Sequence, residues 1–454
     1  MHVVTIETAE LGDRSYLVHD GEIGIVVDPQ RDLDRIEQAI TAAGVRIGLV
    51  LETHVHNDYL SGGLELARRT GAGYVLAGAE PVGFERIAVA DGTLLEAGSL
   101  RVRVLATPGH TEHHTAYLVT GDDSPGAVFT GGSLLFGSVG RTDLVDPART
   151  EELTRAQYRS ARRLAAGLPA ATQVFPTHGF GSFCSAGQTS GASHSTIEAE
   201  RAANDALVTA EEDFVARLIT GLISHPSYYA RMGPRNRAGA GPVDLSPPRR
   251  MDAEDLGQHL AAGTWVVDLR SRTAYAAGHL AGSVGIELGE QFSTYVGWLI
   301  PWGTPVVLLG DSADQVAAAQ RQLVRIGIDR PAGTADLAAL HLTGSYPRVG
   351  FEALVAGVSG PVLDVRRDDE RANGHVTGSA HCPIHRLLDR VAELPAGTLW
   401  VHCESGLRAG IAASLLARAG RDVVLIDDDY AHATALGLTT EPAQPSRRCW
   451  PHRG

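Results

Sequence analysis

An apolar run leads directly into a cysteine loop near the C-terminus, and it reads Leu399-Trp400-Val401-His402-Cys403-Glu404-Ser405-Gly406-Leu407-Arg408. A helical pattern follows at 409–419. In a strand–loop–helix arrangement the backbone N–H groups of the loop and the helix N-terminus converge on the first loop residue and stabilise a thiolate there. Gly406 permits the tight turn, and Arg408 adds a fixed positive charge. We predict that Cys403 is the nucleophile and Arg408 a catalytic residue. The loop around the sulfur is formed by Glu404, Ser405, Gly406 and Leu407. The alternative for Cys403 is a buried structural cysteine.

A second, weaker copy of this region lies earlier in the chain. The run Val266-Val267-Asp268-Leu269-Arg270 matches Val362-Leu363-Asp364-Val365-Arg366, and the Gly-His-x-x-Gly-Ser pattern at 278–283 recurs at 374–379. Apolar runs that alternate with helical patterns predict an α/β parallel sheet in each copy. In the first copy Gly310 stands where the second has Cys403, and the acidic residues Asp311 and Asp314 follow. We therefore expect the first copy to be inactive and to serve as a scaffold or docking module.

Three histidine clusters follow apolar runs in the N-terminal part. His54 and His56 come directly after the run 47–52, and Asp58 continues the alternation. His110 follows the run 102–105, and His178 follows the run 174–176. Alternation puts His54, His56 and Asp58 on one side of an extended stretch, so that the imidazoles can converge on a metal ion. A single histidine of this kind is more simply a capped surface residue, but three strand-end clusters predict a metal site.

Length and composition predict a large soluble enzyme. The 454 residues correspond to about three domains. We expect an N-terminal domain at 1–235, a linker at 236–250, the inactive copy at 251–346 and the active copy at 347–445. The formal net charge of -14 argues against nucleic acid and anionic membranes as partners. Apolar runs are too short for a membrane helix, and the start of the chain has no secretory pattern. The scattered cysteines fit a reducing cytoplasm; they are Cys184, Cys382, Cys403 and Cys449.

The motifs resemble two known families. The Asp-x-Arg, Gly-His-x-x-Gly-Ser and Cys403-loop pattern resembles rhodanese-type sulfurtransferases, in which the loop cysteine carries a persulfide. The histidine clusters of residues 1–200 resemble the metallo-β-lactamase fold, a four-layer α/β/β/α sandwich with metals at the sheet edge. Within that superfamily, the runs 130–135 and 140–144 resemble persulfide dioxygenases, which oxidise a low-molecular-weight persulfide to sulfite at a mononuclear Fe(II). The run 176–184 is similar to dioxygenases fused to rhodanese domains, where a cysteine lies beside the metal pocket.

The chain departs from this family at two ligand positions. The resemblance places iron ligands at His54 and His110, but the third ligand, a carboxylate in the family, falls on Gly132. The second-metal histidine of the dinuclear hydrolases falls on Tyr59. What remains is a mononuclear site, whose predicted ligands are His54, His56 and His110. The wider metal pocket is predicted to include Asp58, His178 and Cys184. We predict one divalent metal, with Fe(II) slightly favoured over Zn; the alternative is a site that binds no metal. On this view Gly132→Asp would raise the affinity for Fe(II).

The combined resemblance implies a cytoplasmic enzyme of sulfur metabolism. The first domain would oxidise a thiol persulfide to sulfite at the metal, as in sulfide detoxification, and Cys403 would transfer sulfane sulfur. The expected partners are small molecules (a persulfide, a thiol, sulfite or thiosulfate), with no nucleic acid and no membrane, and a homo-oligomer is left open. Two other functions are compatible with the sequence. One is a sulfurtransferase or sulfane-sulfur carrier whose metallo-β-lactamase-like domain is catalytically dead. The other is a metallo-hydrolase of the glyoxalase II type.

Overall fold

The computed structural model describes residues 1–121, 125–187 and 191–440. Cys449 and the last residues of the predicted active copy, 441–445, lie outside this part of the chain. The chain forms two compact units. The first contains 1–246 together with 289–297 and 319–330, and the second contains the remaining residues. In the part of the chain that is described, no helix combines the length and the apolar character that a membrane span requires.

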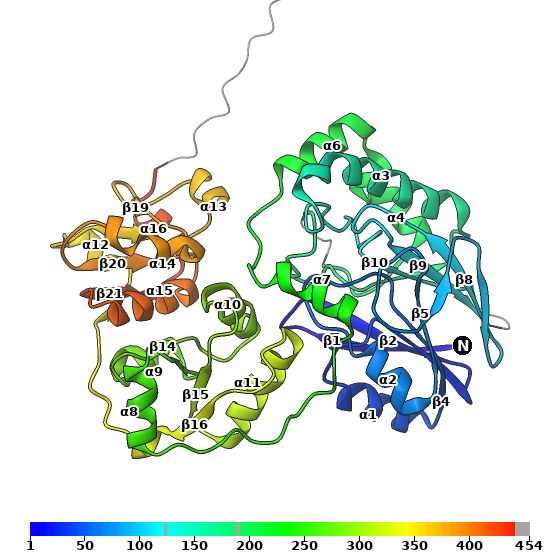
Figure 1. The fold of residues 1–454 in the computed structure, drawn as a ribbon. Coiled ribbons are helices and arrows are strands. Elements are labelled where there is room, and N and C mark those ends of the chain that lie inside the picture. Colours follow the sequence, from blue (N-terminus) through cyan, green and yellow to red (C-terminus); the bar gives the residue numbers. More distant parts are fainter. Residues whose placement is uncertain (122–124, 188–190, 441–454) are drawn as a thin grey trace, which may run out of the picture. The chain divides into compact units, whose positions relative to one another are not determined.

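Two six-stranded sheets form the centre of the first unit (Figure 1). The first sheet follows chain order: β1 (His2–Thr8), β2 (Asp13–His19), β3 (Ile23–Val27), β4 (Arg46–Leu51), β5 (Gly73–Ala77) and β6 (Ile87–Val89). The second has the order β12 (Ser195–Thr196), β11 (Gln173–Pro176), β10 (Ala127–Gly131), β9 (Thr115–Thr120), β8 (Leu100–Ala106) and β7 (Leu94–Ala97).

Helices cover the outer faces of this pair of sheets. The first sheet carries α1 (Asp34–Ala43) and α2 (Gly63–Thr70). The second carries α3 (Thr150–Gly167), α4 (Ile197–Ala203), α5 (Asp205–Val208) and α6 (Glu211–Thr220). This arrangement confirms the predicted α/β/β/α sandwich.

The alternation of side chains along the strands explains the layers. Tyr16 of β2 and Phe129 of β10 meet between the sheets, with ring centroids 5.3 Å apart, and both are buried. On the far side of β10, Val128 packs with Leu164 of α3. Because successive residues of a strand point to opposite faces, one strand contributes to both the central core and a helix-covered core. The strands are thereby fixed, and so are the loops that begin at their carboxyl ends.

The second unit contains two parallel sheets, one from each copy of the repeat. The first copy has the strand order β14 (Val284–Gly285), β13 (Trp265–Asp268), β15 (Val306–Gly310) and β16 (Gly333–Asp336). Its helices are α8 (Ala253–Ala261), α9 (Arg272–Ala277), α10 (Phe292–Leu299) and α11 (Ala313–Arg325). Residues 289–297 and 319–330, within and around α10 and α11, cluster with the first unit.

The second copy repeats this plan. Its strand order is β17 (Arg348–Val349), β21 (Val423–Ile426), β20 (Leu399–His402), β18 (Val362–Asp364) and β19 (Ala380–His381), and all pairs are parallel. Its helices are α12 (Glu352–Val355), α13 (Asp368–Ala372), α14 (Leu387–Arg390), α15 (Leu407–Arg418) and α16 (Tyr430–Ala435). The predicted parallel α/β sheet is therefore present in both copies.

One helix reaches into the segment predicted as a linker. Helix α7 (Tyr229–Ala238) continues past residue 235, although its sequence contains Gly233 and Pro234. Asn236 in its last turn is buried. The composition of this segment favours a loop, but long-range polar contacts of Asn236, described below, stabilise the helix.

Candidate functional site

Four histidines gather at one edge of the sandwich. His54 and His56 follow β4, His110 lies between β8 and β9, and His178 follows β11. All four are almost completely buried. Ring centroids are separated by 4.1 Å for His54 and His56, 4.8 Å for His54 and His110, and 5.2 Å for His110 and His178. Burying a polar ring without a partner costs free energy, so buried imidazoles in mutual contact indicate a metal site.

His54 and His110 are each oriented through one ring nitrogen. His110 Nδ1 donates to the backbone oxygen of Arg141 at 2.7 Å, and His54 Nδ1 lies 2.9 Å from Thr53 Oγ1. Burial lowers the pKa of His110 to about 3. Burial, together with the neighbouring histidines, lowers the pKa of His54 well below its ordinary value. Both rings are therefore neutral at physiological pH, and their Nε2 atoms are available as metal ligands.

His178 connects the predicted ligands with two carboxylates. Its Nδ1 lies 2.8 Å from Asp13 Oδ1 and 3.2 Å from Asp58 Oδ2, and its Nε2 lies 3.3 Å from His54 Nε2. Burial opposes protonation, yet Asp58 and Asp13 raise the pKa of His178 well above its ordinary value. Both carboxylate oxygens of Asp58 are buried without a hydrogen bond. The ligand atoms of His54, His56 and His178 lie within 4.8 Å of one another, so His178 stands among the candidate ligands and not only beside them.

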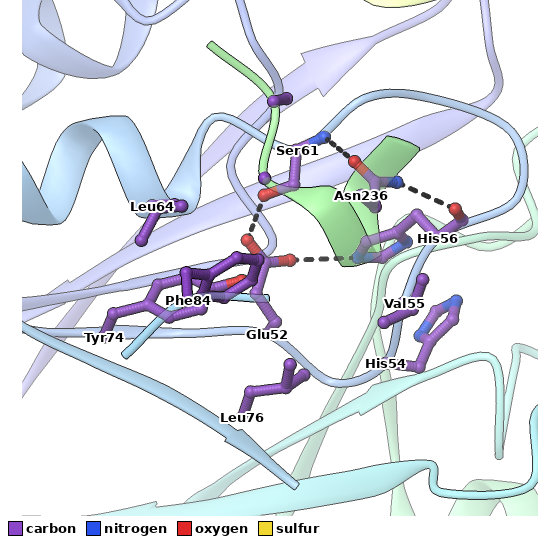
Figure 2. A pocket seen from close by; sticks show the side chains of 12 residues that line it. Glu52, His54, Val55, His56, Ser61, Leu64, Tyr74, Leu76, Phe84 and Asn236 are labelled. Atoms are coloured by element: carbon purple, nitrogen blue, oxygen red, sulfur yellow. Dashed lines mark hydrogen bonds and ion pairs between the residues drawn. The ribbon is translucent and has the colours of Figure 1, made fainter. Parts of the chain in front are cut away.

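His56 is held through its Nε2 atom. This nitrogen lies 3.3 Å from Glu52 Oε2 (Figure 2). It also lies 3.3 Å from Asp28 Oδ1 and 3.0 Å from the hydroxyl of Tyr59. Burial lowers the pKa of His56, but the neighbouring carboxylates of Asp28 and Glu52 outweigh this effect and raise the pKa to about 9. Burial also raises the pKa of Glu52 to about 7. His56 Nδ1 has no hydrogen-bond partner, so the acidic residues fix one nitrogen and leave the other to bind a metal.

Asn236 of α7 fixes the loop that carries His56. Its Nδ2 donates to the backbone oxygens of His56 at 2.9 Å and Tyr59 at 2.8 Å, and its Oδ1 accepts from the Ser61 N–H at 2.9 Å (Figure 2). Ser61 Oγ in turn donates to Glu52. One amide side chain thus forms hydrogen bonds with three backbone groups of the loop that carries His56.

The missing carboxylate position is filled by a histidine ring. A Cβ atom at Gly132 would lie 2.3 Å from His110 Cδ2 and 2.5 Å from His110 Cγ. His110 therefore occupies the space into which a side chain at 132 would extend. Tyr59, at the position that the resemblance assigns to the second-metal histidine, has its hydroxyl 3.0 Å from His56 Nε2, and this hydroxyl donates to the Asp28 backbone oxygen at 3.3 Å.

These residues fit one divalent ion better than two. His54, His56, His110 and His178 supply nitrogen donors, and His56 Nδ1 is buried without a hydrogen-bond partner, as expected for a group that binds a cation. The carboxylate that would bridge two ions is absent at Gly132. Which of the histidines bind, and whether the ion is Fe(II) or Zn, remain predictions.

Cys184 lies beside this cluster and is fully buried. Its sulfur and the ligand nitrogens of His110 and His178 lie within 4.8 Å of one another. Burial raises the pKa of the Cys184 thiol well above its ordinary value. The neighbouring residue Arg141 uses its guanidinium to bond Asp143 at 2.7 and 2.8 Å, so Asp143 supports this loop and is not free to replace the missing ligand.

The cysteine loop of the second copy has the predicted form. Cys403 follows β20, Gly406 has φ +88°, and α15 begins at the next residue. A Cβ at Gly406 would lie 2.1 Å from Asp427 Oδ1, so only glycine fits here. Cys403 is almost completely buried, although a reactive thiol needs access to its donor.

The charges around Cys403 are shared with acidic partners. Arg408 donates to both carboxylate oxygens of Glu370 at 2.6 Å, and Arg366 Nη1 lies 3.4 Å from Glu404 Oε2. The positive charge expected from Arg408 is thus paired with a carboxylate. Its role in catalysis stays a prediction.

The matching loop of the first copy contains no cradle for an anion. Gly310 ends β15, and Gln315 Oε1 accepts from the Asp311 N–H at 2.7 Å, while Gln315 Nε2 donates to the Leu269 oxygen at 3.1 Å. The loop is closed on itself by one amide side chain. The absence of sulfur chemistry in this copy stays a prediction.

Two further buried polar residues at this edge had no clear sequence signal. Asp28, at the end of β3, has φ +48°, a conformation rare for residues other than glycine, and it accepts from the Thr53 N–H at 2.7 Å and from Thr177 Oγ1. His114 Nε2 accepts from the Gly132 N–H at 3.0 Å. In the sequence, the apolar run 102–105 points only to His110 as a candidate ligand. The fold then brings His114 and Asp28 to the edge of the sandwich where the other histidines lie.

Comparisons with known proteins agree with this organisation. The metallo-beta-lactamase superfamily matches residues 11–178, and the rhodanese-like domain matches 252–346 and again 351–434. The crystal structure of a metallo-beta-lactamase from Staphylococcus aureus subsp. aureus COL is 25% identical, with a TM-score of 0.65, and the match covers 74% of this chain and 99% of that one. The match therefore extends beyond a single metallo-β-lactamase domain.

Two further relatives match only part of the chain. A hydroxyacylglutathione hydrolase from Methylococcus capsulatus is 36% identical over 167 residues, which is 36% of this chain and 60% of that protein. The crystal structure of ETHE1 from Myxococcus xanthus is 27% identical, with a TM-score of 0.45, over 52% of this chain and 99% of that one. This chain thus spans less than two thirds of the curated hydrolase.

Proposed function

Because this chain consists of a metallo-β-lactamase domain followed by two rhodanese-like domains, we propose that it is a two-centre enzyme of persulfide metabolism. The metal centre oxidises a low-molecular-weight thiol persulfide to sulfite, and Cys403 transfers sulfane sulfur. The enzyme acts in sulfide detoxification in the cytoplasm. The observation that carries it is the presence, in one chain, of a histidine cluster without a bridging carboxylate and a rhodanese-type cysteine loop.

The metal centre favours a small sulfur substrate. A bound divalent ion would supply positive charge for a persulfide anion and open positions for O₂. His54 and His110 would hold it, with His56 and His178 oriented by acidic partners. In the overall reaction one O₂ and one water provide the three oxygens of sulfite, the S–S bond of the persulfide breaks, and the thiol leaves with release of two protons.

The transfer at Cys403 requires no oxidant. The thiolate attacks the outer sulfur of a donor persulfide, the donor S–S bond breaks, and the donor leaves as a thiolate. Cys403 then carries the sulfur as a persulfide until an acceptor thiol or sulfite attacks it. Backbone N–H groups at the start of α15 stabilise the negative sulfur in both forms.

A second candidate is favoured by the curated relatives. The hydroxyacylglutathione hydrolase match indicates thioester hydrolysis in the first domain, a reaction of the glyoxalase II type. Gly132 and Tyr59 argue against it, since the chain lacks two groups with which a dinuclear hydrolase would bind its ions. The remaining candidate is a sulfur carrier whose first domain is inactive and whose chemistry is confined to Cys403.

The three candidates are separated by measuring both centres in the intact protein. With glutathione persulfide as substrate, the wild type should consume O₂ and form sulfite, and it should transfer sulfur to an acceptor thiol. The His54→Ala/His110→Ala variant should lose metal and O₂ consumption and keep transfer. Cys403→Ser should keep metal and O₂ consumption and lose transfer, because a hydroxyl forms no persulfide. Hydrolysis of a hydroxyacylglutathione without O₂ uptake would favour the hydrolase, and sulfur transfer alone would favour the carrier.

A further inference from the structure

The first unit contains a thiol among its histidines that the predicted ligand set does not use. Cys184 is fully buried, and its Sγ lies within 4.8 Å of the ligand nitrogens of His110 and His178. Those two imidazoles are themselves buried. The position follows β11 by only a few residues, in the run Gly181-Ser182-Phe183-Cys184. Sulfur and two nitrogens at this spacing form a donor set for a single transition-metal ion.

The backbone of Arg141 holds the two sides of this set in one frame. The Arg141 oxygen accepts from His110 Nδ1 at 2.7 Å, and the Arg141 N–H donates to the Cys184 oxygen at 2.8 Å. The Cys184 N–H donates to Ser182 Oγ at 3.1 Å. The guanidinium of Arg141 also bonds the backbone oxygen of Phe183 at 3.1 Å. Histidine and cysteine are therefore positioned by the same residue, as expected for ligands of one ion.

His178 completes the set from the opposite side. Asp13 and Asp58 hold its Nδ1, which leaves Nε2 available, and this atom lies 3.3 Å from His54 Nε2. Two nitrogens bound tetrahedrally at about 2.0–2.1 Å lie about 3.3–3.4 Å apart. The observed separation thus equals the one that a shared ion imposes.

We propose that Cys184 supplies the anionic ligand that Gly132 cannot, so that the ion is held by His110, His178 and the Cys184 thiolate, with His54 as the fourth donor. The thiol loses its proton to solvent when the ion binds, and the thiolate then supplies the negative charge that a carboxylate at position 132 would have supplied. This inference rests on the proposed metal centre and changes its ligand set.

The test uses Co²⁺ as a spectroscopic probe in the intact chain. Protein freed of metal with a chelator is loaded anaerobically with one equivalent of Co²⁺. The wild type should show an intense near-ultraviolet thiolate-to-cobalt charge-transfer band, and Cys184→Ser should lose it. Cys382→Ser is the matched control, since Cys382 is equally buried but lies in the second rhodanese copy. Both Cys382→Ser and Cys403→Ser should keep the band.

A measurement on the wild type alone guards against misfolding of the variant. X-ray absorption of the Zn²⁺-loaded protein should show one sulfur at about 2.3 Å and the remaining donors as nitrogen or oxygen. Cobalt or zinc bound without a sulfur neighbour would overturn the proposal and leave the metal centre itself intact. A charge-transfer band that persists in Cys184→Ser would overturn it as well. Failure of the wild type to bind either ion would instead refute the metal centre of the proposed function.

Discussion

At the scale of single residues, Gly132 is tied to the position of His110. From the sequence alone, Gly132→Asp is expected to restore a carboxylate ligand and raise the affinity for Fe(II). The structure shows that any Cβ at this position would lie 2.3 Å from His110 Cδ2, far closer than real contacts allow. His110 cannot easily retreat, because its Nδ1 is bonded to the Arg141 oxygen and a Cβ at Gly140 would lie 2.6 Å from that nitrogen.

Gly132→Asp should therefore lower metal content and not raise it. The matched control is Gly132→Ala, which introduces the same Cβ without a carboxylate and should be equally damaging. Elemental analysis after reconstitution with Fe(II) or Zn²⁺ measures the effect. If Gly132→Asp bound Fe(II) more tightly than the wild type while Gly132→Ala bound it less tightly, the ring would have moved aside and the added carboxylate would be a true ligand.

Glu404 is the residue that should set the choice of sulfur donor. Its side chain is half-exposed and lies 3.4 Å from Arg366 Nη1, and Glu404 directly follows Cys403 in the chain. At a separation of about 5 Å, the Glu404 carboxylate repels an incoming dianion, which costs on the order of 1 kcal/mol, or about fivefold in rate. The same carboxylate repels a singly charged donor less. We predict that glutathione persulfide outperforms thiosulfate and that Glu404→Lys reverses the order. Donor comparison at fixed ionic strength decides it, and a wild type that prefers thiosulfate would refute the assignment.

At the scale of secondary-structure elements, local patterns were sufficient where function is local. The strand, glycine turn and helix around Cys403 are contiguous, so the loop could be predicted from ten residues. The helix α7 could not be predicted in this way, because Asn236 forms hydrogen bonds with His56, Tyr59 and Ser61, which lie far away in the sequence. The segment 197–220 likewise depends on distant contacts. It forms three short helices, α4, α5 and α6, and the first break falls at Asn204, whose side chain donates to the backbone oxygens of Leu135 and Ser138.

Strand β20 contains a histidine that should make the second copy sensitive to acid. Burial lowers the pKa of His402 to about 4, against about 6.5 in an unfolded chain. Between these two values the unfolded chain binds a proton that the folded chain does not. Stability therefore falls as the pH drops from about 6.5 to about 4, by at most about 3 kcal/mol.

The corresponding variant is His402→Gln, which cannot titrate. Its denaturant midpoint for loss of Cys403 transfer should change less between pH 7.5 and pH 5 than that of the wild type. Comparison at pH 7.5, where His402 is neutral in both states, corrects for the packing change that the substitution brings. An acid dependence as steep as in the wild type would show that other groups are responsible.

At the scale of the whole molecule, the two copies of the repeat differ in their predicted roles. The first copy is predicted to be a scaffold or docking module, because Gly310 stands where the second copy has Cys403. Within the second compact unit, Arg272 at the start of α9 supplies a physical basis for that role. Its Nε lies 2.6 Å from Asp427 Oδ1, and its Nη2 donates to the backbone oxygen of Ser405 at 3.3 Å. Glu287 of the same copy holds Arg272 in place at 2.7 Å.

Arg272 should thus position the Cys403 loop from a different domain. Arg272→Ala leaves Cys403 intact but removes the bond to Ser405 and one partner of Asp427, so sulfur transfer should fall by roughly tenfold through loss of alignment. Arg272→Lys keeps the charge but not the two-sided contact, and should recover only part of the rate. The matched control is Arg348→Ala, which removes the other Asp427 contact, at 3.1 Å, without touching the loop. It should change transfer far less. If both alanine variants lost the same activity, the ion pair with Asp427 would matter only for stability. If neither did, the first copy would have no part in positioning the nucleophile.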